Sequence, residues 1–118
     1  MKVKEAIMAF SQSEKIKAGL IWVSQALQLL NGLPEPEKQG SEKTSKAMIG
    51  MIVHEIQLGK NITGDVSWDE VIRRIDRAMV MINSGVAAEA VVHLTQALSQ
   101  VTSIGHRSMS FLKEKGFL

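Results

Sequence analysis

Residues 16–30 read IKAGLIWVSQALQLL, and the spacing of their apolar side chains indicates the class of fold. Steps of four, three, four and three residues separate the large aliphatic positions, which are Ile16, Leu20, Val23, Leu27 and Leu30. An α-helix turns once every 3.6 residues, so side chains at these steps share one face. The segment therefore predicts an amphipathic helix that packs a single apolar stripe against other helices.

Three later segments show the same spacing. Their stripes are Met48, Ile49, Ile52 and Ile56 in the second segment, Val71, Ile75, Ala78 and Ile82 in the third, and Ala87, Val91, Leu94, Leu98 and Val101 in the fourth. Glycine, proline and asparagine mark turns between them at residues 31–40, 59–65 and 83–85. In the last turn, Gly85 suits the left-handed position that follows many helices.

We therefore predict an all-α, up-and-down bundle that forms a single domain over residues 1–118. The expected helices cover about residues 3–31, 42–58, 68–83 and 86–113. Ser41 is the expected N-cap of the second helix, and Ser67 with Glu70 forms a capping-box pattern at the third.

The beginning of the first helix is ambiguous. Val3, Ile7 and Phe10 lie roughly 120–180° away from the main stripe on a helical wheel. Between the two sets, Ser11 and Glu14 form another capping-box pattern. Either the helix breaks there, or one long helix with at most a slight kink faces two neighbours. We favour the long helix, because nothing in residues 11–14 forbids helical structure.

Composition excludes several classes of function. The chain has no cysteine, which removes disulfides, zinc–thiolate sites and thiol catalysis. The net charge is only +2, and the densest basic cluster (Arg73, Arg74, Arg77) is interleaved with acids, so nucleic acid is an improbable partner.

The opening residues are charged and amphipathic, which favours a cytoplasmic protein over a secreted one. We expect no membrane association, because the least charged segment is too short and too polar for a span.

The least expected feature is a lack of charge. Residues 18–34 carry no charged side chain, and residues 90–106 carry only histidines. A surface helix of a monomeric bundle normally has charges on its outer face. We interpret the deficit as a homodimer interface on the first and fourth helices, with candidate residues Trp22, Val86, Ala90, Ala97, Ile104 and Phe111. Plain solvent exposure of uncharged residues and a groove for another protein are the alternatives.

Polar candidates are few. Glu55 falls inside an apolar sector between Met48 and Met51, where a carboxylate is costly unless it is paired. Arg74 is one possible partner, and a buried acid beside His54 or His93 is the functional alternative. The spacing of the histidines does not match a di-metal bundle motif, so we predict no metal and no cofactor.

The sequence thus favours a non-enzymatic, self-associating helical interaction protein, such as an adaptor or a chaperone-like protein. The alternative is a small ligand-binding or enzymatic bundle that uses Glu55 with His54 or His93.

Overall fold

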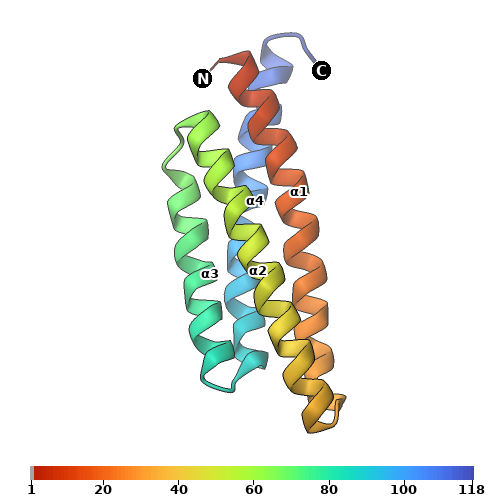
Figure 1. Cartoon of the computed structure of the whole chain (residues 1–118). Helices are drawn as coiled ribbons and strands as arrows, with labels where there is room; N and C mark the ends of the chain where they lie inside the picture. Colours follow the sequence, from red (N-terminus) through yellow and green to blue (C-terminus); the bar gives the residue numbers. More distant parts are fainter. Residues whose placement is uncertain (1) are drawn as a thin grey trace.

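The computed structural model describes residues 2–118 as an elongated bundle of four helices, 53 × 22 × 18 Å along its principal axes (Figure 1). The helices are α1 (Val3–Gln28), α2 (Glu35–Thr63), α3 (Ser67–Asn83) and α4 (Ala87–Glu114), and a 3-10 turn, η1 (Leu29–Gly32), follows α1. Consecutive helices run in opposite directions, and α4 packs on both α3 and α1. The predicted all-α, up-and-down four-helix bundle is confirmed.

The core is aliphatic and follows the predicted stripes. Every member of the stripe that begins at Ile16 and ends at Leu30 is at most 1% exposed. Ile49, Ile56, Val71 and Ile75 are equally buried, and Trp68 is the one aromatic side chain fully enclosed with them. At about 25 cal/mol per Å² of buried apolar surface, this core supplies most of the stability of the fold.

α1 passes through residues 11–14 without a break. Ala6 and Ala9 continue the core side of the helix, while Ile7 is 49% exposed. The capping-box pattern at Ser11 is therefore an internal helical segment. Small residues on the core side let α1 continue along its neighbours, which is why the apolar Val3–Phe10 set does not require a second helix.

The prediction for α2 is wrong at both ends. The helix begins at Glu35 rather than near residue 42, with Pro34 as its N-cap residue and Pro36 in its first turn. Proline fits there because the first turn has no intrahelical acceptor for its missing N–H. Glu35 and Glu37 also favour this start, because carboxylates interact well with a helix N-terminus. The prolines that seemed to mark a loop therefore begin a helix.

At its C-terminal end, α2 continues past Gly59 to Thr63. Gly59 is helical, and a Cβ atom there would lie 3.2 Å from the indole of Trp68, so the glycine permits close packing. The stop comes at Gly64, whose φ of 67° is left-handed and whose N–H donates to the carbonyl of Lys60. The indole N–H of Trp68 donates to the Thr63 hydroxyl at 3.2 Å.

The caps of α3 are partly as predicted. The residue before the helix is Val66, and no capping box forms at Ser67. Instead, Asp65 Oδ1 accepts the backbone N–H of Ser67 at 2.8 Å. At the other end, Gly85 has a φ of 81°, which confirms the predicted left-handed glycine.

The buried face of α4 shares Leu94 and Val101 with the predicted stripe but is rotated away from its other members. Its buried positions are Ala90, Leu94, Ala97, Val101, Ile104, Gly105, Ser108 and Leu112. Ala87, Val91 and Leu98, expected at the centre of the stripe, are only partly buried. Small residues lie at the centre because α4 packs between α1 and α3. The closest approach is at Gly105, where a Cβ atom would lie 2.5 Å from Ser13 Oγ and 3.2 Å from Ser13 Cβ.

This contact predicts a stability effect. Ser13 is fully buried and its hydroxyl donates to the Phe10 carbonyl, so it has no free space to move into. Gly105→Ala should lower the free energy of unfolding by about 1–3 kcal/mol, because α1 and α4 must separate. Gly50→Ala is the matched control: nothing lies within 4 Å of its Cβ position, so the helix should gain about 0.5–1 kcal/mol. Urea unfolding followed by circular dichroism measures both, and a gain for both variants would contradict the packing described.

Candidate functional site: Glu55 and the exposed faces of α1

Glu55 is held by two side chains of α1. Its Oε1 lies 3.2 Å from Lys15 Nζ, and its Oε2 accepts a hydrogen bond of 3.0 Å from Gln12 Nε2. Gln12 also donates to the backbone carbonyl of Glu55 at 2.9 Å. The Glu55 side chain keeps 27% of its surface exposed. The carboxylate thus lies at the border between α1 and α2, satisfied by an amide and an ammonium group.

The contacts with Gln12 and Lys15 favour the ionised form of the Glu55 carboxylate. The hydrogen bond from Gln12 and the contact with Lys15 hold the pKa of Glu55 below its ordinary value of 4.5, against the smaller opposing effect of burial. A lowered pKa does not suit a general acid at neutral pH. Glu55 is therefore ionised at neutral pH.

The other polar candidates lie apart from this group. Arg74, the partner first considered, contacts Gln96 and Glu70 instead. His54 is exposed, and the half-buried His93 is on α4, which does not pack against α2. His93 Nδ1 is buried and has no hydrogen-bond partner among the described residues. Within residues 2–118, no group of three or more His, Asp or Glu residues is placed to hold a metal ion.

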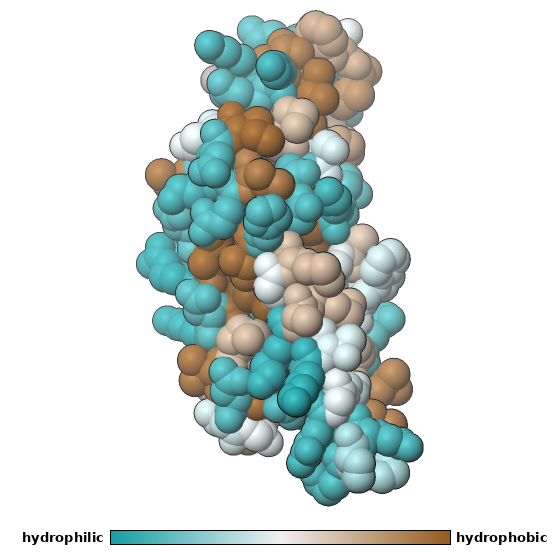
Figure 2. Space-filling view, viewed as in Figure 1, coloured by the Kyte–Doolittle hydropathy of each residue, from teal (hydrophilic) through white to brown (hydrophobic). Residues whose placement is uncertain are grey.

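An apolar strip runs along the border of α1 and α2, on the face that Figures 1 and 2 turn toward the viewer. We call it the α1–α2 seam. Figure 2 shows hydrophobic side chains along it, interrupted by hydrophilic ones. Met8, Lys15, Trp22 and Leu29 follow one another at seven-residue steps, which keeps them on one side of the chain. Opposite them, α2 contributes Met48, Met51, Glu55, Leu58 and Ile62.

The seam is unusually exposed for its composition. Trp22 is 66% exposed, Leu29 69% and Met51 62%. The steps of three and four residues from Met48 to Ile62 mark a second stripe on α2. The sequence pattern indicated the part of this stripe around Met48, Met51 and Glu55, but not its continuation to Leu58 and Ile62.

A hollow of about 180 Å³ opens in the middle of the seam. Ile16, Gly19 and Ile52 line it together with Met48, Met51, Lys15 and Glu55. Gly19 packs closely on α2, since a Cβ atom there would lie 3.1 Å from Ile52. Because glycine has no side chain above this contact, the surface is concave at this point.

The predicted interface residues are divided between surface and core. Trp22 and Val86 are exposed, and Phe111 is half-buried. Ala90, Ala97 and Ile104 are at most 2% exposed inside the chain's own core, so they offer no surface to a partner. This part of α4 packs against α1 and α3 of the same chain.

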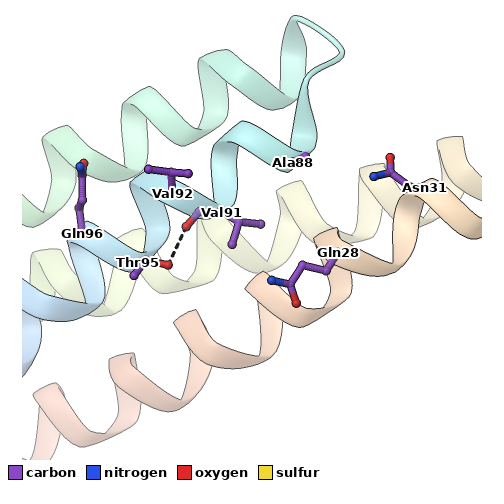
Figure 3. Close-up of a pocket in the computed structure, with 7 residues that line it drawn as sticks. All are labelled: Gln28, Asn31, Ala88, Val91, Val92, Thr95 and Gln96. Carbon is purple, nitrogen blue, oxygen red and sulfur yellow. Dashed lines mark hydrogen bonds between the residues drawn. The ribbon is translucent and has the colours of Figure 1, made fainter.

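A second hollow of about 480 Å³ lies between the end of α1 and the beginning of α4 (Figure 3). Gln28 and Asn31 line one side of it, and Val91, Val92 and Thr95 line the α4 side. The Thr95 hydroxyl donates back to the Val91 carbonyl at 2.9 Å and is therefore already satisfied. The hollow contains no charged group, in keeping with the charge deficit of both segments.

Comparison with known proteins adds no relative: no protein-family model, curated protein or solved structure matches the chain. None of the helices in residues 2–118 combines the length and the apolar composition that a membrane crossing requires.

The lowered pKa of Glu55 gives a prediction about pH. Its ionised form is favoured in the folded state, so its stabilisation is complete above pH 4.5 and is lost as the pH falls through the lower folded-state pKa. Glu55→Gln should reduce the free energy of unfolding by about 0.5–1 kcal/mol at pH 7, as expected for a partly exposed pair. Below the folded-state pKa the wild type and the variant should converge.

Urea unfolding at pH 7 and at a series of lower pH values measures this difference. Glu14→Gln is the control, because Glu14 forms an exposed pair with Lys17 on α1 alone and should cost no more than about 0.5 kcal/mol. A difference between wild type and Glu55→Gln that grows as the pH falls below 4.5 would contradict the assignment.

Proposed function

We propose that the chain is a non-enzymatic, self-associating interaction protein whose dimer interface is centred on α1. One observation carries the proposal: the uncharged part of α1 and η1 exposes two large apolar side chains on the same side, Trp22 and Leu29, by 66% and 69%. Exposed apolar patches of this kind are typical of protein interaction sites.

The lack of charge favours a second copy of the same chain as the partner. In a two-fold symmetric interface, each surface meets an identical surface, so charges of one sign near the axis repel. Residues 18–34 carry no charge and avoid this cost. The proposal keeps α1 from the predicted interface and replaces the buried residues of α4 with the neighbouring α1–α2 seam.

No observation favours an enzyme. Glu55 is an ionised, paired carboxylate, and neither His54 nor His93 bonds to it. A cytoplasmic location, expected from the sequence, remains part of the proposal.

Leu29→Glu tests the function directly. A carboxylate at this position would lie inside an apolar interface without a partner, so the dimer should weaken by about 30-fold or more. Light scattering coupled to size-exclusion chromatography at micromolar concentration should show a dimer for the wild type and a monomer for the variant.

Val80→Glu is the matched control, because Val80 is 58% exposed on α3, away from the uncharged segment. It introduces the same charge and should leave the dimer intact. A wild-type chain that is monomeric at micromolar concentration would refute the proposed function.

A further inference from the structure

We infer that the dimer forms by reciprocal insertion, in which Trp22 of each copy fills the hollow beside Gly19 of the other copy. The inference rests on the proposed self-association and identifies its contact surface as the α1–α2 seam. Trp22 and the hollow lie close together on the same surface, so the exposed indole of one copy can occupy the hollow of the other.

The hollow is open to solvent and measures about 180 Å³, so a flat aromatic ring of a second copy can enter it from outside. Its floor consists of Ile16 and Ile52, and its walls include the flexible side chains of Met48 and Met51. Methionine adapts to the shape of an inserted ring and makes favourable sulfur–aromatic contacts.

The positions of Trp22 and the hollow are compatible with a closed, two-fold symmetric dimer. Gly19 and Trp22 are three residues apart, which is about 4.5 Å along a helix. A two-fold axis perpendicular to α1 and passing between them brings Trp22 of each copy over the hollow of the other. One contact formed twice therefore completes a closed dimer and leaves no unfilled hollow for a third copy.

The polar groups beside the hollow match an indole. A buried tryptophan N–H needs an acceptor, and the Glu55 carboxylate, which is ionised at neutral pH, lines the hollow. Its contacts with Gln12 and Lys15 occupy one site on each oxygen, and a carboxylate has further lone pairs that accept another hydrogen bond.

The charges do not oppose the pairing. With the axis midway between Gly19 and Trp22, the Lys15 residues of the two copies lie about 16 Å apart along the helices. This separation exceeds the Debye length of about 8 Å at physiological ionic strength, so their repulsion is screened. The exposed tryptophan is also the residue type that most often dominates an interface energetically.

The fluorescence of Trp22 provides the test. Trp68 is fully buried and Trp22 is 66% exposed, so acrylamide quenching of the monomer reports on Trp22. Diluting the wild type through its dimer Kd should increase quenching as Trp22 leaves the hollow. Trp22→Phe should remove this concentration dependence, because only the buried tryptophan remains. A dimer whose quenching does not change with concentration would overturn the inference but not the self-association.

Two surface variants locate the interface. Trp22→Ala should raise the dimer Kd by about 30-fold or more, and circular dichroism should show an unchanged fold because the side chain is exposed. Val92→Lys, at a 58% exposed site beside the α1–α4 hollow, should change the Kd less than about twofold. Dissociation by Val92→Lys with little effect of Trp22→Ala would place the interface on α1 and α4 and overturn the inference. A wild-type chain without any dimer would instead refute the proposed function itself.

Discussion

The close approach of α1 and α4 at Ser13 and Gly105 determines much of the remaining structure. Because a glycine and a serine meet there, the two helices lie close enough for α4 to bury alanines at Ala90 and Ala97 between α1 and α3. This contact holds the Ser13 side of α1 against α4. The stripe from Ile16 to Leu30 turns inward, and Trp22 and Leu29 necessarily turn outward. The candidate interface is thus a consequence of core packing.

Sequence patterns predicted the fold because each large aliphatic stripe has helical spacing and must be buried. They failed at the ends of α2, where the same residue types have two meanings. Pro36 begins a helix as readily as it interrupts one, and Gly59 permits a helix to pack on Trp68 as readily as it ends one. The difference depends on neighbours that are distant in sequence. The stripe of α4 was misplaced for a related reason: large side chains were taken as its centre, whereas helices that pack on two neighbours place small residues there.

The candidate site was predicted in part. Glu55 was identified as unusual from its apolar neighbours on α2, and in the structure Gln12 and Lys15 contact its carboxylate. Its partners Gln12 and Lys15 could not be read from the sequence, because they depend on the relative register of α1 and α2. The apolar sector around Met48, Met51 and Glu55 could be seen in the sequence, but its exposure could not, because exposure is a property of the assembled bundle.

The unequal lengths of the helices divide the molecule along its axis. α3 has 17 residues and spans about 26 Å, whereas the other three have 26 to 29 residues and extend beyond it (Figure 1). All four helices therefore pack side by side only in the middle of the molecule. The beginning of α2, with η1 against it, is supported mainly by a helix pair and has fewer buried contacts. Amide hydrogens in this projecting end open to solvent at lower free energy than those in the middle, so the bundle contains a stable central unit and a more easily opened extension.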